Sequence, residues 1–455
     1  MTSRTWACRP GLAVIAAAIA AVAPADVAEP GDYAIVVSAA TRSDPAWAAV
    51  VAALEAKHRG RGPHVIEWQE SMDEAVRPLA ASMPRYACFV ARPEEAGRDF
   101  VAAVHRLARR LDDDPYGDVL WGILTGYDAA NALAIASTAE PLVVHRVTAG
   151  TELAMDRVVE GEWFCELQRN RMVRKRAGGE AEELRGPDDT TAALAARLSD
   201  GVTDLFVTSG HATERDWQIG FGYENGQFRS GGGRLWGLDT SGRRIPIESP
   251  NPKVWLPVGN CLAGHIDGPD ALALAFMNSC GVRQMIGYTV PTWFGYAGWG
   301  LLDTFVEQPG RFTLCEAFHA NHHALVHRLE THAAPGDERG LRFDRDVVAF
   351  YGDPAWDVRM AAGPLQYRQT LTEADGVFTL EVVPLDGTRS FAPVNTNGSQ
   401  RGGRPIVQFL PRRLAAVEVV EGGAWKPVVT DTFILVPLPP PDSTDTLRVA
   451  VRDRE

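Results

Sequence analysis

The fold and the chemistry of this chain are constrained most by two strand-like apolar runs. Each run is followed directly by a chemically reactive side chain. The first run is Thr203–Gly210 (TDLFVTSG), and His211 follows it. The second run is Val254–Asn260 (VWLPVGN), and Cys261 follows it. Buried strands of a parallel sheet read as short apolar runs, and ligands gather at the carboxyl ends of such strands. We therefore expect the imidazole and the thiol to lie at one edge of a sheet, where a thiolate has a base beside it.

Strand-like runs alternate with helical patterns over most of the chain. Strands are expected at 33–38, 63–68, 86–91 and 118–126, and helices at 45–59, 72–81, 100–111 and 127–137. The alternation resumes after residue 190 and predicts an open, mostly parallel α/β sheet in two subdomains, 32–150 and 151–360. From about residue 363, short strands separated by turn residues predict a small C-terminal β-sandwich over 363–455.

Residues 1–25 have the pattern of a signal peptide. Arg4 and Arg9 precede an apolar stretch over 11–23, and Ala23-Pro-Ala25 fits a cleavage site. The stretch is short for a membrane span, so we expect a cleaved leader and no stable membrane span. The expected location is exported: the periplasm, the cell surface or the extracellular medium. The formal net charge of −13 argues against nucleic acid as a partner.

The cysteine count also points to a reactive thiol. Cleavage after residue 25 removes Cys8 and leaves five cysteines, so at least one thiol is free or paired between chains. A catalytic nucleophile is one reason for an exported protein to keep a free thiol. The other four cysteines are either buried small hydrophobic residues or two disulfides, and the sequence leaves both readings open.

The residues around His211 and Cys261 resemble the caspase–gingipain group of cysteine peptidases, and gingipains in particular. The His precedes the Cys by 50 residues. The similar segments are Ser209-Gly-His-Ala, Gly259-Asn-Cys-Leu-Ala-Gly, Gly281-Val-Arg-Gln-Met-Ile-Gly-Tyr-Thr and Tyr351-Gly-Asp-Pro-Ala-Trp-Asp-Val-Arg. The sequence departs from the group at two points. Ala212 stands where Gly usually follows the His, and Gly-Asn-Cys replaces the caspase Gln-Ala-Cys.

The resemblance implies a gingipain-like cysteine endopeptidase that hydrolyses peptide bonds of a protein or peptide substrate. Cys261 would be the nucleophile, and His211 the general base and then the general acid. The backbone N–H of Cys261 itself, together with that of Ala212 or Gly210, would bind the oxyanion. Gingipain-like enzymes also have an acidic residue upstream of the His, and no local motif chooses among the three candidates: Glu152, Glu160 and Glu162.

The same resemblance covers the remaining features of the site and the fold. It implies that the C-terminal β-sandwich is immunoglobulin-like, that no cofactor is required, and that calcium is admissible as a structural ion. The aromatic segment 289–300 would help to wall the substrate pocket. Trp293 is the residue expected to contact substrate, with Trp217 as a second. Ordinary aromatic packing accounts for these two residues about as well.

A helical row of histidines does not make a convincing metal site. His319, His323 and His327 recur at i, i+4 and i+8, the spacing by which some helices hold zinc. No Glu follows His319 and no further ligands are evident, so we expect a solvated or core helix face and no metal.

Two functions other than peptidase stay open. One is a catalytically inactive peptidase fold that serves as a binding or adhesion module. The other is a cysteine amide hydrolase or transferase acting on non-peptide substrates. Thiol labelling separates the first from an enzyme, and peptide panels separate the second from a peptidase.

Overall fold

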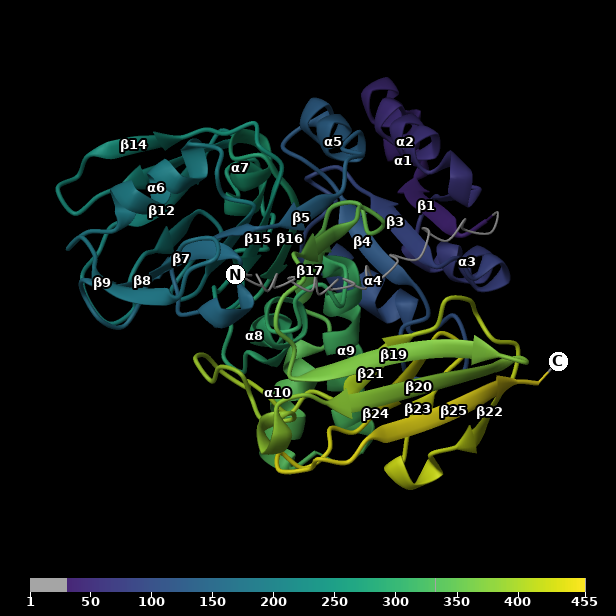
Figure 1. Ribbon diagram of the computed structural model, residues 1–455. Helices are drawn as coiled ribbons and strands as arrows, with labels where there is room; N and C mark the ends of the chain where they lie inside the picture. Colours follow the sequence, from purple (N-terminus) through teal and green to yellow (C-terminus); the bar gives the residue numbers. More distant parts are fainter. Residues whose placement is uncertain (1–30, 332, 455) are drawn as a thin grey trace, which may run out of the picture.

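A computed structural model describes residues 31–331 and 333–454 of the chain. The predicted signal peptide, residues 1–25, lies outside the described residues. Figure 1 shows a large central sheet with helices against it and a smaller all-β module beneath. Over the described ranges, no helix has both the length and the apolar character needed to cross a membrane.

The first half of the large sheet consists of parallel strands with helices on both faces. Its strands are β1 (Tyr33–Ser38), β2 (His64–Trp68), β3 (Tyr86–Val90) and β4 (Leu120–Leu124). Helices α1 (Ala39–Ser43), α2 (Pro45–Lys57) and α5 (Ala129–Ala136) lie on one face, and α3 (Val76–Ser82) and α4 (Arg98–Ala108) on the other (Figure 1). Every residue of β1, β3 and β4 is buried, as expected for strands covered on both sides.

The second half of the sheet carries the residues singled out from the sequence. Its parallel strands are β6 (Arg146–Ala149), β7 (Glu160–Phe164), β10 (Leu205–Thr208), β15 (Lys253–Pro257) and β16 (Val282–Tyr288). Two antiparallel strands extend its edge, β8 (Arg171–Lys175) and β9 (Ala181–Arg185). Because β6 pairs with β10 and β7, the two halves divide before β6, at a point earlier than the predicted boundary at residue 150.

Strand β17 (Val348–Tyr351) joins the two halves into one sheet. It pairs parallel to β4 and antiparallel to β16. The full order is β2-β1-β3-β4-β17-β16-β15-β10-β6-β7-β8-β9. Because β17 runs antiparallel to β16, the strands of the two halves point in opposite directions. One edge of the sheet therefore holds the amino ends of β17 and β4 and the carboxyl ends of β6, β10, β15 and β16. The predicted open, mostly parallel α/β sheet is confirmed.

Further elements cover the second half. A small antiparallel sheet packs on helices α6 (Thr191–Ser199) and α7 (Leu272–Ser279). Its strands are β11 (Asp216–Gln218), β12 (Gln227–Gly231), β13 (Arg234–Leu238) and β14 (Arg244–Ile247). A two-stranded sheet pairs β5 (Leu142–Val144) with β18 (Val358–Met360). Helix α8 (Tyr296–Leu301) continues into a π-helical turn at Leu302–Val306, and α10 is Pro335–Asp344.

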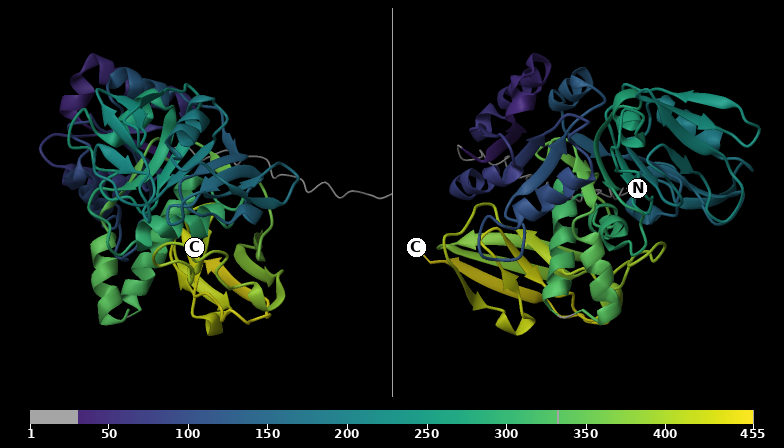
Figure 2. Two further views of the ribbon diagram at one scale, coloured as in Figure 1. Left: turned by 90° about the vertical axis from the view of Figure 1, so that its left-hand side faces the viewer. Right: turned by 180° about the vertical axis from the view of Figure 1, so that it is seen from behind.

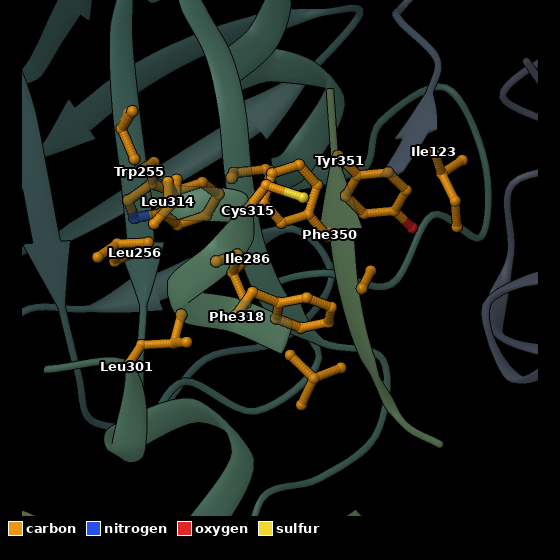
Figure 3. Packing of buried hydrophobic residues seen from close by; sticks show 14 of the residues in the cluster. Ile123, Trp255, Leu256, Ile286, Leu301, Leu314, Cys315, Phe318, Phe350 and Tyr351 are labelled. Carbon is orange, nitrogen blue, oxygen red and sulfur yellow. The ribbon is translucent and has the colours of Figure 1, made fainter. Parts of the chain in front are cut away.

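Helix α9 (Leu314–Glu330) packs its apolar side on the middle of the large sheet. Its start is fixed by a capping box in which Thr313 and Glu316 satisfy each other's backbone N–H groups. Figure 3 shows Cys315 and Phe318 of α9 beside Phe350 of β17, and the two phenyl rings lie 5.5 Å apart.

The histidine row of α9 is part of this core. His319 and His323 are buried, and His323 stacks on Phe433 at 4.3 Å. Burial lowers the pKa of His319 to about 3, so its ring is held neutral. His319 accepts the backbone N–H of Trp121 at 2.9 Å. The residues therefore belong to the packed interface between the sheet and the C-terminal module.

The C-terminal module is a β-sandwich, as predicted. One sheet has the order β19 (Tyr367–Ala374), β20 (Val377–Pro384), β25 (Leu447–Asp453) and β22 (Val417–Glu421). The other has the order β21 (Ile406–Phe409), β24 (Phe433–Val436) and β23 (Val428–Val429). The alternating inward residues of both sheets form a separate core, and Figure 2 shows the module as a lobe against α9.

Candidate functional site

His211 and Cys261 leave adjacent parallel strands at the same edge of the sheet. Strands β10 and β15 pair in register, with Thr208 opposite Pro257. His211 follows three residues after the end of β10, and Cys261 follows four residues after the end of β15. The site therefore occupies the carboxyl edge of the parallel strands, where open α/β sheets place their ligands.

Asn260 ties the two segments together. Its side chain is fully buried. It accepts a hydrogen bond from the Thr208 hydroxyl at 2.7 Å and donates one to the Gly210 carbonyl at 3.1 Å. Asn260, directly before Cys261, thus holds Gly210, directly before His211. The relative position of the two segments is therefore set by a buried amide side chain.

The thiol of Cys261 receives a backbone hydrogen bond from a third strand end. The N–H of Thr292 lies 3.2 Å from Sγ, and Thr292 follows β16, the neighbour of β15. An N–H donated to sulfur stabilises negative charge on that atom. The side chain of Cys261 is partly exposed, so a reagent or substrate can reach it.

The other described cysteines are buried. Burial raises the pKa of Cys280 to about 11, and it raises the pKa values of Cys88 and Cys315 further. Cys165 is buried as well. All five cysteines of the described ranges are free, which favours the reading as small core residues over the two-disulfide alternative.

The backbone on both sides of Cys261 is tightly constrained. Leu262 adopts a left-handed conformation with φ +59°, which is uncommon for a branched side chain. Its N–H donates to the Val290 carbonyl at 3.1 Å, which holds the turn in place. On the other side, a Cβ at Gly259 would lie 2.7 Å from the indole nitrogen of Trp299. Strained residues that the surroundings hold in place gather at functional sites.

His211 lies on the surface in a tight loop. Its ring packs against Phe221, with 4.7 Å between ring centroids, and both side chains are exposed. The His211 carbonyl accepts the N–H of Gln218 at 2.9 Å. The N–H of Ala212 has no acceptor among residues 31–331 and 333–454. The neighbouring Gly210 has φ +93°, a conformation that favours glycine.

The three acidic candidates occupy different ends of their strands. Glu152 follows the carboxyl end of β6, next to β10, and pairs with Arg171 at 3.2 Å. Glu160 is the first residue of β7, towards the opposite edge. Glu162 is buried within β7 and forms ion pairs of 2.7 Å with Arg174 and with Arg197. Of the three, Glu152 is the one placed at the edge that carries His211.

A further carboxylate at this edge, Glu166, has no signature in the sequence. It is 6% exposed and accepts hydrogen bonds from the Thr151 hydroxyl at 2.7 Å and the Asn397 amide at 3.2 Å. Its backbone carbonyl accepts the N–H of Phe221, the residue packed on His211. Asn397 belongs to a loop of the C-terminal module, so that module reaches into the candidate site.

The two tryptophans expected to bind substrate differ in exposure. Trp293 is 52% exposed and follows Thr292, the donor to the thiol. Its ring lies 5.4 Å from Phe343. Trp217 is fully buried against Phe228, and its indole N–H donates to the Ser209 carbonyl at 2.7 Å. A side chain with no exposed surface cannot line an open pocket, so the prediction for Trp217 is replaced by a structural role.

Comparisons with known proteins give matches only among solved structures. No family model and no curated protein sequence matches the chain. The chain is similar to a crystal structure of the Arg-specific cysteine proteinase gingipain R, with 11% identity and a TM-score of 0.46, over 91% of this chain and 94% of that one. It is also similar to a structure described as a protease, with 10% identity and a TM-score of 0.46, over 79% of this chain and 86% of that one.

Proposed function

We propose that the protein is a cysteine peptidase whose nucleophile is Cys261 and whose acid–base residue is His211. The observation that carries the proposal is the junction of strands β10 and β15. There a partly exposed thiol and an exposed imidazole leave adjacent strand ends that Asn260 ties together. The other described cysteines are buried and do not meet this requirement.

The proposed reaction proceeds through an acyl-enzyme. Sγ of Cys261 attacks the carbonyl carbon of the scissile bond, and the thiol proton passes to His211. N–H groups of Ala212 and Cys261 face the developing oxyanion in this scheme, with Gly210 as the other backbone donor predicted from the sequence. His211 then gives its proton to the leaving amine, and water hydrolyses the thioester. No cofactor is required.

Glu152 is the proposed orienting acid, on the strength of its place at the carboxyl edge of β6. Trp293 is proposed to contact the substrate, because it is an exposed aromatic residue directly after the donor to the thiol. A protein or peptide is the proposed substrate. We also propose that the enzyme acts after export, on the pattern of residues 1–25.

The first test is alkylation by iodoacetamide between pH 5 and 8, with mass spectrometry to locate the modified thiol. We expect Cys261 to react at least about tenfold faster than Cys88, Cys280 and Cys315, whose buried thiols are a control in the same molecule. His211→Ala should slow the reaction of Cys261 by about tenfold or more and leave the others unchanged. Equal rates at Cys261 in wild type and His211→Ala would contradict the proposed pairing.

A peptide panel tests the substrate class. We expect cleavage of fluorogenic peptides by the wild type and none by Cys261→Ala, with Cys165→Ala as a control thiol variant. Fast alkylation at Cys261 with no cleavage of any peptide or denatured protein would instead support an amide hydrolase on non-peptide substrates. Slow alkylation with no cleavage would support the inactive binding module.

A further inference from the structure

Two large apolar side chains, Phe221 and Leu167, are exposed in the loops beside His211. Phe221 is 51% exposed and Leu167 is 52% exposed, although large hydrophobic residues are exposed at only seven positions in the described ranges. The ring of Phe221 lies 4.7 Å from the ring of His211. Exposed apolar area that gathers beside a functional residue is typical of a surface that a ligand covers.

The backbone holds these two residues next to each other. The N–H groups of Phe221 and Gly222 both donate to the carbonyl of Glu166, which directly precedes Leu167 in the chain. A Cβ at Gly222 would lie 2.4 Å from the carbonyl oxygen of Leu167. The two segments are therefore in direct contact, and this close approach requires glycine at position 222.

Side-chain contacts fix the same two loops, residues 165–169 and 221–225. The hydroxyl of Tyr223 donates to the carbonyl of Cys165 at 3.0 Å. The guanidinium of Arg169 lies over the Tyr223 ring, 5.6 Å from its centre. Because the loops hold each other in place, a ligand that covers Phe221 and Leu167 would lose little affinity to the ordering of a loose loop.

The chemistry of peptide-bond cleavage determines which part of a substrate lies beside Phe221. After Sγ of Cys261 has attacked, His211 gives its proton to the leaving amine, so the nitrogen of that amine lies within hydrogen-bond reach of the imidazole. The α-carbon of the residue after the scissile bond is bonded to this nitrogen. The side chain of that residue therefore lies close to the ring that packs on His211, which is the ring of Phe221.

Trp293 lies on the other flank of the nucleophile. It follows the end of β16, and the strand order β16-β15-β10 places Cys261 between the end of β16 and the end of β10. The acyl part of the substrate, which stays bonded to Sγ, thus has Trp293 within its reach. The leaving part, on the side of His211, faces Phe221.

We propose that Phe221 and Leu167 bind an apolar side chain of the residue directly after the scissile bond, a role that rests on the proposed function of Cys261 and His211. Burial of apolar area against the two exposed side chains favours leucine or phenylalanine at that position of the substrate. The Glu166 carbonyl between them already accepts two N–H groups, so it offers no free acceptor to a polar side chain. A polar residue would therefore lose water without gaining a partner there.

The test compares kcat/KM for two peptides that differ only in the residue after the scissile bond, leucine or asparagine, which are similar in size. For the wild type we expect the leucine peptide to be cleaved at least about tenfold more efficiently. Phe221→Ala and Leu167→Ala should each reduce this ratio to about threefold or less, and Phe221→Leu should keep it high. Leu385→Ala removes an equally exposed leucine from the C-terminal module and should leave the ratio unchanged.

The ratio of the two peptides separates substrate contact from a purely structural role. Because Phe221 also packs on His211, a structural role would lower the cleavage of both peptides equally and leave the ratio unchanged, which would overturn the proposal. A wild-type ratio near one, or a change of preference only at the residue before the scissile bond, would also overturn it. These outcomes leave the peptidase function intact, whereas no cleavage of any peptide by the wild type would overturn that function and this role together.

Discussion

Replacement of Asn260 by Ala tests the central feature of the candidate site. The Asn260 side chain is fully buried and makes one hydrogen bond to the β10 strand end and one to the loop before His211. In Asn260→Ala, the Gly210 carbonyl loses its donor and the Thr208 hydroxyl loses its acceptor. Thr208 still accepts the indole N–H of Trp255 at 3.1 Å, so that part of the core stays in place.

The expected cost follows from two buried polar groups left without partners. Each such group costs about 1–3 kcal/mol, and Gly210 is partly accessible to water. We therefore expect a total destabilisation of about 2–4 kcal/mol. Because the loop before His211 loses its tether to the residue before Cys261, we also expect alkylation of Cys261 to lose most of its dependence on His211.

The assay combines denaturant unfolding with the iodoacetamide rate at Cys261. Asn278→Ala is the matched control, because it removes one amide hydrogen bond, to the Gly233 carbonyl at 3.0 Å, away from the site. This control should cost about 1 kcal/mol and leave the rate at Cys261 unchanged. Neutral surface substitutions change the free energy of unfolding by up to about 0.5 kcal/mol. If Asn260→Ala changed it by no more than this and kept the wild-type alkylation rate at Cys261, the hydrogen bonds of Asn260 would have no role in the site.

Three further outcomes are expected. Burial lowers the pKa of His319 to about 3, so unfolding takes up a proton as the pH falls through about 6.5, and stability falls with the pH. His319→Gln should reduce the slope of unfolding free energy between pH 7 and 5 by about 1 kcal/mol per pH unit on average, and an unchanged slope would refute this. Asp353 is buried against Lys57 and His58, so Asp353→Asn should lower the free energy of unfolding in denaturant by about 3–5 kcal/mol. Asp73 forms an exposed pair with Arg110, so Asp73→Asn should lower it by less than about 1 kcal/mol. Similar costs for the two variants would contradict the role of burial. Asn397→Ala removes a hydrogen-bond donor to Glu166, so it should lower the free energy of unfolding by about 1–3 kcal/mol. It should also raise KM for peptides more than it changes kcat. Unchanged Tm and KM would mean that the C-terminal module does not contribute to the site.

The sequence predicts a strand well where burial on both faces dictates its hydrophobic pattern. Strands β1, β3 and β4 are covered on both faces, so they read as continuous apolar runs and were predicted within a few residues. Strand β9 has the polar, mostly exposed sequence AEELR, and its extended form comes from pairing with β8, which no local pattern encodes. The four-residue β17 was equally hard to place, because its position depends on two partners far away in the chain.

The same contrast holds at the candidate site. His211 and Cys261 could be selected because each reactive side chain follows an apolar run. The sequence leaves Trp217 open between substrate contact and core packing, because an aromatic residue after a strand gives no sign of whether it faces the core or the solvent. Thr292, Glu166 and Asn397 act through contacts that exist only after distant strand ends and the C-terminal module have come together.

The insertion of β17 also bears on how the chain is made. The ribosome completes β1–β4 and β16 well before residues 348–351 emerge. Until then, β4 and β16 each present an unpaired row of backbone groups, which is a template for association with other chains. Insertion of one short strand therefore removes two open strand edges at the centre of the large sheet in a single step, and a chain that lacks this strand keeps both edges free to pair with other chains.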